Sequence, residues 1–159
     1  MGLSDLYIDG LHVPFPFDSI YPEQLRYMHH LKRTLDQRGQ GLLEMPTGTG
    51  KTVSVFSLIC AYQRKYPEMG KLVFCTRTVP EMSKALRELN VVMDFQDSVF
   101  QDKRPFLGLG LSARKNMCIN GSVLSAGNAE AINAKCRQVT RAGDIEDIGT
   151  QEGSGDGHD

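Results

Sequence analysis

The sequence predicts an α/β fold in which helices cover a parallel β-sheet. Between residues 41 and 90, short apolar runs alternate with helical patterns, which is the order typical of parallel sheets. A phosphate-binding loop lies between the first apolar run and the helix that follows it, and such sheets bind ligands beyond the carboxyl ends of their strands. The chain has 159 residues, which is enough for one domain with a buried core.

The N-terminal elements are predicted to be a hairpin and a helix. Asp9-Gly10 separates the apolar runs 6–8 and 11–13, and this dipeptide tolerates the positive φ angles of a type I′ turn. Pro22 favours the start of a helix, and Gly39 lies past its end. Between these two residues, apolar side chains recur at helical spacing: Leu25, Met28, Leu31 and Leu35.

After residue 40 the sequence predicts three strands and two helices. The strands are expected at 41–45, 71–76 and 103–111. One helix is expected from the phosphate loop to about residue 65, and another from residue 80 to about residue 90. Beyond residue 112 the periodicity fades, and residues 143–159 are rich in Gly and Asp with few apolar side chains, so this tail is predicted to be disordered.

The phosphate-binding loop has the sequence Glu-Met-Pro-Thr-Gly-Thr-Gly-Lys-Thr at residues 44–52. Its glycines allow backbone N–H groups to surround a phosphate, and the following helix adds its positive N-terminal end. Lys51 can reach the β- and γ-phosphates of a nucleotide, and the Thr52 hydroxyl can ligate Mg²⁺, so these two residues are the catalytic candidates. Met45 stands where the strict form of the motif has Gly. The expected nucleotide-binding residues of the loop are Met45, Pro46, Thr47, Gly48, Thr49, Gly50, Lys51 and Thr52.

The charge distribution is uneven along the chain. Residues 1–142 carry 18 basic and 13 acidic side chains, a net charge of +5, whereas residues 143–159 carry six acids and no base. A modestly basic body suits a polyanionic partner, although an ordinary solvated surface explains it equally well. No apolar run approaches the ~20 residues of a membrane span, and no secretory signal is visible, so no membrane partner is expected.

A second polar motif follows the apolar run 71–75. Thr76-Arg77-Thr78 places two hydroxyls and a guanidinium at the predicted ligand end of the sheet, where they suit phosphate oxygens. An ordinary polar strand terminus is the alternative interpretation.

The four cysteines fall into two pairs. Cys60 lies in an apolar helical pattern and Cys75 in an apolar strand pattern, so both are predicted to be buried thiols. Cys118 and Cys136 lie in polar, basic stretches. Their spacing alone favours free thiols over a metal site.

Several segments together resemble the xeroderma pigmentosum group D family, the iron–sulfur superfamily 2 DNA helicases. These segments are 21–24, 31–35, 44–52, 61–64, 76–81 and 112–118. The likeness runs from about residue 7 to about residue 136 and covers only the first part of the family's much longer chain.

The resemblance implies a domain organisation and a set of roles. Residues 1–111 would be the N-terminal part of a RecA-like P-loop NTPase domain, 112–142 the start of an iron–sulfur region, and 143–159 an acidic tail. ATP and Mg²⁺ would bind the phosphate loop, with Gln24 recognising adenine, and residues 76–78 would hold single-stranded DNA. Cys118 and Cys136 would be the first two of four ligands to a 4Fe–4S cluster, whose other two ligands this chain lacks.

The resemblance further implies a 5′→3′ DNA helicase of excision repair and transcription initiation, acting in the nucleus with other subunits of transcription factor IIH. Whether this chain is itself an enzyme stays open, because hydrolysis also needs an acidic motif and an arginine. The sequence has no Asp-Glu-Ala-His box, and its nearest approximation, residues 91–94, lacks the adjacent Glu. The second motor domain of the family is also absent. We therefore expect an N-terminal piece of the helicase with little or no hydrolysis. A non-catalytic interaction fragment and a non-helicase P-loop NTPase, such as a nucleotide kinase, are the alternatives.

Overall fold

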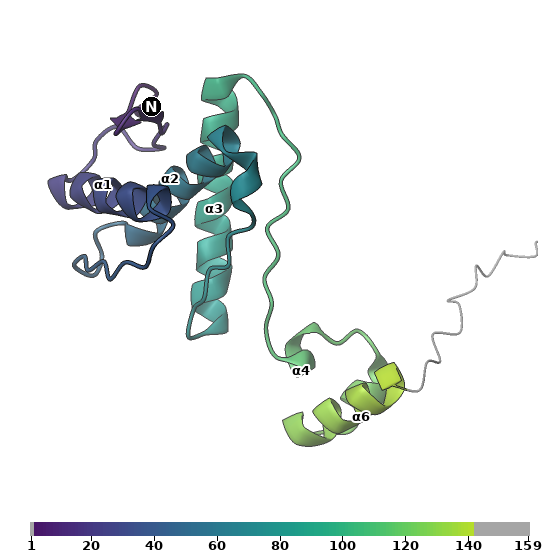
Figure 1. Ribbon diagram of the computed structural model, residues 1–159. Helices are drawn as coiled ribbons and strands as arrows, with labels where there is room; N and C mark the ends of the chain where they lie inside the picture. The colour runs from purple at the N-terminus through teal and green to yellow at the C-terminus, as the bar shows by residue number, and fades with distance from the viewer. Residues whose placement is uncertain (1, 142–159) are drawn as a thin grey trace, which may run out of the picture. The chain divides into compact units, whose positions relative to one another are not determined.

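The computed structural model describes residues 2–141, so the predicted disorder of residues 143–159 lies outside the described residues. Contacts divide the chain into two units, Met1–Gly110 and Leu111–Asp159, and each is described by itself. The first unit contains helices α1, α2 and α3, and the second contains α4, α5 and α6 (Figure 1).

The predicted hairpin is confirmed. Strands β1 (Tyr7–Ile8) and β2 (Leu11–His12) pair antiparallel, with Tyr7 opposite His12 and Ile8 opposite Leu11. Asp9 and Gly10 connect them with φ angles of 44° and 75°, as a type I′ turn requires. The side chains of Ile8 and Leu11 are buried in the core of this unit.

The first two predicted helices are also confirmed. Helix α1 (Pro22–Asp36) begins with Pro22 in its first turn, and helix α2 (Lys51–Lys65) follows the phosphate loop directly. The residue with positive φ after α1 is Arg38, at 50°, and not Gly39. A short 3₁₀ helix, η1 (Pro67–Met69), follows α2 and ends at Gly70.

Helix α3 (Val79–Phe100) is longer than predicted, because its apolar spacing continues past residue 90. Its buried residues, Ala85, Leu89, Val92 and Gln96, recur three and four positions apart, so one face of the helix is covered along its length. Residues 91–94, the nearest imitation of an acidic motif, lie inside this helix and not at the end of a strand.

The core of the first unit lies around α2, which contacts both α1 and α3. Its fully or nearly fully buried apolar side chains include Val13, Phe15, Met28, Phe56, Leu58 and Val92. Buried polar side chains join them, among them Gln96, whose Nε2 donates to the backbone oxygens of Pro14 (3.2 Å) and Ser57 (2.8 Å). This bond pair ties α3 to α2 and to the segment after the hairpin.

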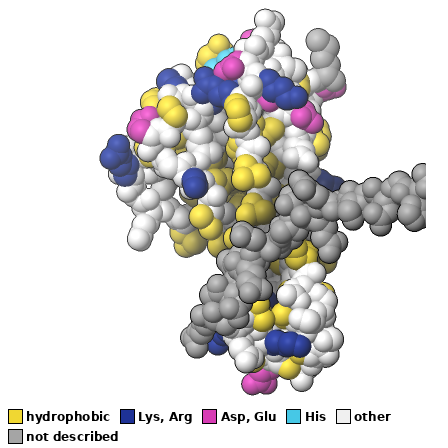
Figure 2. All heavy atoms as spheres, turned by 90° about the vertical axis from the view of Figure 1, so that its right-hand side faces the viewer, with side chains coloured by type: hydrophobic (Ala, Val, Ile, Leu, Met, Phe, Trp, Pro, Cys, Tyr) yellow, Lys and Arg dark blue, Asp and Glu magenta, His cyan; other side chains and the backbone are white. Residues whose placement is uncertain are grey.

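The three predicted strands are not observed as strands. Segments 41–45, 71–76 and 103–111 run as irregular chain, and the described residues contain only the two-stranded sheet of β1 and β2. A parallel strand is stable only between hydrogen-bonded neighbours, and these segments do not pair with one another. Several of their apolar side chains are therefore exposed, among them Leu42, Val73 and Leu107. Figure 2 shows apolar side chains gathered on one face of the first unit.

The second unit consists of helices that the sequence did not predict. Helix α6 (Ala129–Arg141) contacts both α4 (Arg114–Met117) and α5 (Gly121–Leu124). Val123 and Ile132 supply its buried apolar side chains. Helices of four residues such as α4 and α5 are too short to leave a periodic pattern in the sequence. Across the described residues of both units, no helix has the length and apolar character needed to cross a membrane.

Candidate nucleotide-binding site

The phosphate loop meets the N-terminus of α2 at Gly50. Gly48 and Gly50 both adopt positive φ, 81° and 74°, a conformation that glycine adopts without steric cost. Gly50 is the N-cap of α2, and Lys51 is the first residue of the helix. The loop predicted from sequence therefore has the backbone conformation expected of a phosphate site.

The N-terminus of α2 is open, in contrast to that of α3. No side chain caps α2, so its first-turn N–H groups have no side-chain acceptor among the described residues. At α3 the Thr78 hydroxyl accepts from the Glu81 N–H, and the Glu81 carboxylate accepts from the Thr78 N–H. Exposed donors at a helix N-terminus form an anion site, and α2 offers such donors next to Lys51.

Two hydrogen bonds hold the loop in shape. The Lys51 ammonium donates to the backbone oxygen of Met45, and the Thr49 hydroxyl donates to the backbone oxygen of Pro46 at 2.7 Å. The Met45 side chain is buried, so this residue anchors the loop although it replaces the glycine of the strict motif. The Lys51 charge therefore lies against the loop's own backbone, from which a phosphate could draw it away.

Gln24 lies next to the loop, at the start of α1. Its Oε1 accepts from the Tyr21 N–H at 2.9 Å, and its side chain is only 4% exposed. On the other side, a β-carbon built on Gly50 would lie 2.6 Å from Gln24 Nε2. The structure thus brings this predicted adenine-binding residue against the phosphate loop.

Thr52 lies half-buried in the first turn of α2, directly after Lys51. Mg²⁺ commonly takes one or two protein oxygens and completes its coordination with water and phosphate oxygens, so a single threonine is compatible with this ion. The described residues contain no group of three or more His, Cys, Asp or Glu side chains that could hold a metal on their own.

Residues 76–78 lead into α3, and their polar groups are largely engaged locally. Thr78 caps the helix, and the Thr76 hydroxyl donates to the backbone oxygen of Thr78 at 3.2 Å. The Glu81 carboxylate also accepts from the Arg77 N–H at 3.1 Å. Arg77 is exposed, and its guanidinium has no hydrogen-bond or ion-pair partner in the described part of the chain. Of the three residues, Arg77 is the one free to contact a phosphate.

The cysteines do not assemble a complete cluster site. Cys118 and Cys136 lie half-buried in the second unit, where Cys118 Sγ donates weakly to the Asn120 oxygen at 3.8 Å. Cys60 is buried, as predicted, and burial raises the pKa of its thiol to about 12 although the nearby Arg64 lowers it. Cys75 is exposed, and the prediction of burial was wrong because the segment that carries it forms no strand. A 4Fe–4S cluster uses four thiolates, and the second unit offers two among its described residues.

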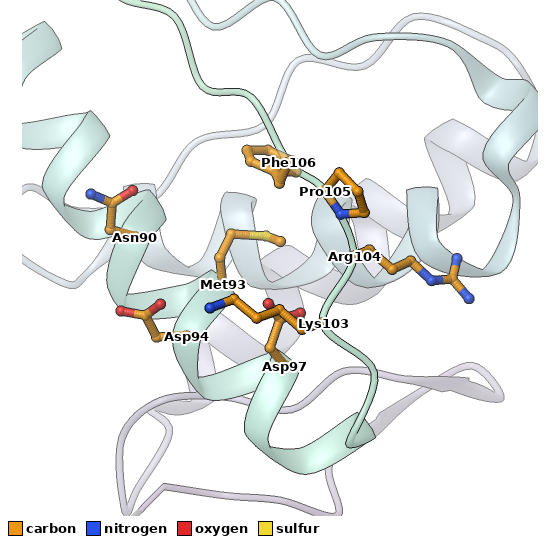
Figure 3. A pocket seen from close by; sticks show the side chains of 8 residues that line it. All are labelled: Asn90, Met93, Asp94, Asp97, Lys103, Arg104, Pro105 and Phe106. Atoms are coloured by element: carbon orange, nitrogen blue, oxygen red, sulfur yellow. The ribbon is translucent and has the colours of Figure 1, made fainter.

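An open pocket of about 460 Å³ that the sequence did not indicate lies between α3 and the segment that follows it (Figure 3). Its lining residues are Asn90, Met93, Asp94, Asp97, Lys103, Arg104, Pro105 and Phe106. Asp97 pairs with Arg64, and Arg104 pairs with Asp102 at 2.7 Å. Asp94 and Lys103, which also line the pocket, carry opposite charges, so the pocket has no excess of positive charge comparable with the open helix N-terminus and Lys51 at the loop.

Comparison with known proteins identifies the family. The family model DEAD_2 matches residues 74–150. The XPD helicase subunit of general transcription and DNA repair factor IIH from Schizosaccharomyces pombe is 51% identical over 134 residues, which are 84% of this chain and 17% of the relative. The chain belongs to the XPD helicase family. The XPD subunit from Arabidopsis thaliana is 51% identical over 84% of this chain and 18% of its own length. The XPD/RAD3 subunit from Saccharomyces cerevisiae is 48% identical over 84% of this chain and 17% of its own length.

Membership of the XPD family confirms the resemblance inferred from the sequence segments and implies a RecA-like helicase fold. The chain spans only 17% to 18% of the length of these XPD relatives.

Proposed function

We propose that the chain binds ATP and Mg²⁺ through residues 45–52, as the nucleotide-binding part of an XPD-family helicase. The observation that carries this proposal is the uncapped N-terminus of α2, which meets two left-handed glycines and Lys51. Backbone N–H donors and a lysine ammonium arranged in this way suit a polyphosphate ligand.

Each group of the loop has a role in this proposal. The backbone N–H groups around Gly48 and Gly50 surround the phosphates, and Lys51 exchanges the Met45 oxygen for the β- and γ-phosphates. Thr52 supplies one ligand to Mg²⁺, which neutralises phosphate charge when bound. Gln24 adjoins the loop and is the candidate for recognising adenine. The exposed residues Pro46 and Thr47 and the half-buried Thr49 complete the loop around the phosphates.

Calorimetric titration with ATP and Mg²⁺ tests the proposal. We expect Lys51→Ala to weaken binding by at least about tenfold, because a charge-assisted bond to phosphate is lost. Lys84→Ala is the matched control, since Lys84 is an exposed lysine on α3, away from the loop, that pairs with Glu88. Equal affinity of the wild type and Lys51→Ala would overturn the proposal.

We further propose that this chain alone does not hydrolyse ATP at a steady rate. The 159 residues contain no second acidic motif that could hold the metal and polarise water. Residues 91–94 lie inside helix α3, whereas such a motif lies at the end of a strand. A steady ATPase rate that disappears in Lys51→Ala would contradict this.

Residues 76–78 are proposed to contact the backbone of single-stranded DNA, chiefly through Arg77. Removing one phosphate contact lowers affinity for all sequences and reduces the salt dependence of binding. In anisotropy titrations with an oligothymidylate, Arg77→Ala should reduce the slope of log affinity against log salt by about one. As a control, Arg87→Ala, which removes an exposed arginine within α3, should leave the slope unchanged.

The relatives' printed names support a wider proposal. They are helicase subunits of a general transcription and DNA repair factor, so we propose that the chain serves 5′→3′ unwinding in repair and transcription in the nucleus, together with other factor IIH subunits. Segments 41–45, 71–76 and 103–111 are proposed as strands that pair in a parallel sheet when their neighbours are supplied. Pull-down with factor IIH subunits tests the association.

Cys118 and Cys136 are proposed to supply two thiolates to a 4Fe–4S cluster only if the other two come from outside residues 1–159. The support is their half-buried position in one small helical unit. Absorbance and iron content of anaerobically purified protein test this. Iron that stays bound after Cys118→Ser and Cys136→Ser would exclude these residues as ligands.

The exposed apolar side chains of Leu107 and Leu109 favour a second candidate, a non-catalytic interaction module. In that case the association with factor IIH subunits would persist in Lys51→Ala and would be lost when both leucines are replaced by Ser.

A further inference from the structure

We propose that the open pocket between α3 and residues 103–106 binds a short peptide segment of another protein, one that presents an apolar side chain between a basic and an acidic residue. The pocket has a volume of about 460 Å³, within the range of about 300 to 1,000 Å³ that is typical of ligand pockets. The phosphate loop contributes none of its lining residues, so the inference goes beyond the proposed function of residues 45–52 and does not depend on it.

A network around Arg64 of α2 fixes one end of the pocket. Arg64 pairs with Asp97 of α3 and donates to the backbone oxygen of Asp102 at 2.7 Å. Arg104 completes the network, because its Nε donates to Asp102 Oδ2 at 2.7 Å and its Nη1 donates to the Arg64 oxygen at 3.1 Å. The Arg64 side chain is only 10% exposed, so the chain leaves the end of α3 along a fixed path.

Two glycines fix the other end, where the segment packs directly on α3. A β-carbon on Gly108 would lie 3.1 Å from Leu89 Cδ2, and one on Gly110 would lie 2.9 Å from Leu86 Cδ1. A larger residue at either position would push the chain away from the helix. Residues 103–106 therefore run between two fixed points and leave a gap beside α3 that no described side chain fills.

The direction of the side chains separates this pocket from the exposed leucines. In an extended stretch, successive side chains point to opposite sides. A β-carbon on Gly108 would also lie 3.7 Å from Phe106 Cε1, so Phe106 shares the side of the segment that faces α3. Leu107 lies between these two residues and is 85% exposed. Phe106 thus belongs to the pocket, and Leu107 belongs to the opposite face.

The pocket has an apolar side and a charged side (Figure 3). Met93 points toward Pro105 and Phe106, and these three side chains form the apolar side. Asp94 and Lys103 lie on the charged side, where both are exposed and neither has an ion-pair or hydrogen-bond partner in the described part of the chain. Unpaired charges of both signs beside an apolar surface suit a ligand that carries both charges around an apolar group.

The helix sets the length of the ligand. The lining residues of α3 follow the i, i+3, i+4, i+7 pattern of one helix face: Asn90, Met93, Asp94 and Asp97. This face extends over about 10 Å, because a helix rises about 1.5 Å per residue. An extended peptide covers that distance with about three residues. The apolar residue would pack on Met93, with the basic residue paired to Asp94 and the acidic residue paired to Lys103.

A nucleic acid fits this pocket less well than a peptide does. Two carboxylates and two cationic side chains line it, and one of each is already paired, Asp97 with Arg64 and Arg104 with Asp102. The charges are therefore balanced, whereas binding of a phosphate backbone needs an excess of positive charge. An apolar side chain inserted into a pocket is, by contrast, the usual anchor of a protein–protein contact.

Selection from a library of random seven-residue peptides displayed on phage, with the full chain as bait, tests the inference. We expect the enriched peptides to place an apolar residue between a basic and an acidic one. Fluorescence anisotropy of a labelled enriched peptide then gives its affinity. Phe106→Ala and Asp94→Asn should each weaken binding by at least about tenfold, since an apolar contact or a charge pair is lost. Both variants replace exposed side chains, so folding should be preserved.

Each variant has a matched control. Leu107→Ala removes the neighbouring apolar side chain on the opposite face of the segment. Glu88→Gln removes a carboxylate of α3 that lies outside the pocket and pairs with Lys84. Both controls should bind the enriched peptide within about twofold of the wild type.

A charge exchange tests the pairing with Asp94 directly. Asp94→Lys should reject the enriched peptide and bind a copy in which glutamate replaces the basic residue. Failure of this exchange would contradict the proposed orientation of the peptide.

Three results would overturn the inference. The first is a selection that enriches no peptide over a bait carrying both Phe106→Ala and Asp94→Asn. The second is a loss of affinity in Leu107→Ala but not in Phe106→Ala, which would place the peptide on the outer leucines. The third is displacement of the peptide by an oligothymidylate, which would assign the pocket to nucleic acid.

Discussion

The two glycines of the phosphate loop share a left-handed conformation but differ in their surroundings. A β-carbon on Gly48 would meet no atom within 4 Å, whereas one on Gly50 would collide with Gln24 Nε2. Both substitutions with alanine force a residue with a β-carbon into positive φ, which costs about 1 kcal/mol or more. Only the substitution at Gly50 adds a steric conflict.

We therefore predict that Gly50→Ala lowers the free energy of unfolding by about 1 kcal/mol more than Gly48→Ala does. Urea unfolding without nucleotide measures both variants, since a bound ligand would mix affinity with stability. Adding Gln24→Ala to Gly50→Ala should remove part of the difference. Equal losses of unfolding free energy at the two positions would show that the Gln24 side chain moves aside at little energetic cost.

The buried thiol of Cys60 allows a prediction about reactivity. Burial raises its pKa to about 12, so almost no thiolate exists at neutral pH. Alkylation with iodoacetamide at pH 8, followed by peptide mass spectrometry, should label the exposed Cys75 in the native chain and Cys60 only after denaturation. Labelling of native Cys60 at the rate of Cys75 would mean that α2 opens readily.

At the scale of elements, a charged network joins α1 to α2. Lys32 is buried and donates from Nζ to Asp36 Oδ2 at 2.6 Å, and the Tyr62 hydroxyl of α2 donates to Asp36 Oδ1 at 3.1 Å. The hydrogen bond from Lys32, with a smaller contribution from Tyr62, lowers the pKa of the Asp36 carboxyl. A lowered pKa means that the carboxylate stabilises the fold above its unfolded pKa, and that this stabilisation is lost as pH falls through the folded value.

Asp36→Asn should accordingly destabilise the chain by about 1 kcal/mol at pH 7, a small effect because the carboxylate is partly exposed. The difference from the wild type should begin to shrink below about pH 4, where the carboxyl of the unfolded chain becomes protonated, and should vanish only below the lowered folded-state pKa. Urea unfolding at pH 7 and pH 3 measures it. A difference that is independent of pH would assign the loss to packing and not to charge.

The elements that the sequence predicted well are those specified by neighbouring residues. The hairpin follows from Asp9-Gly10, and α1 and α2 follow from their apolar spacing and from Pro22 or the loop glycines. The strands at 41–45, 71–76 and 103–111 were not confirmed, because a strand depends on partners that local sequence cannot reveal. The end of α3 was placed too early, since the β-branched Val91 and Val92 obscured its helical pattern.

The candidate site was predictable where it is contiguous in sequence. Residues 44–52 form a recognisable motif, and the structure gives Gly48 and Gly50 the expected backbone conformation. The contact between Gln24 and Gly50 joins residues 26 positions apart, and the bond from Lys51 to the Met45 oxygen depends on a side-chain conformation. Neither the contact nor the hydrogen bond can be predicted from the residue types alone.

At the scale of the whole molecule, the exposed apolar segments have a consequence in solution. Leu107 and Leu109 are 85% and 66% exposed, and Val73 is 81% exposed. Apolar patches of this kind promote association or dye binding. We predict that the chain self-associates above micromolar concentration, and that Leu107→Glu with Leu109→Glu reduces this in sedimentation velocity runs. The same sedimentation for both proteins would show that these leucines do not drive association.

The open N-terminus of α2 makes the stability of the chain depend on the buffer. A side-chain cap at this position would contribute about 1 kcal/mol, and its absence leaves the unliganded chain without that contribution. A small anion that binds these N–H donors in the folded chain restores part of this stability by mass action. The gain increases with the logarithm of the anion concentration once that concentration exceeds the dissociation constant. The chain should therefore melt at a higher temperature in phosphate than in Tris at equal pH and ionic strength, and Lys51→Ala should reduce that gap. The open helix end thus makes the unliganded chain less stable and makes its melting temperature depend on the anions in solution.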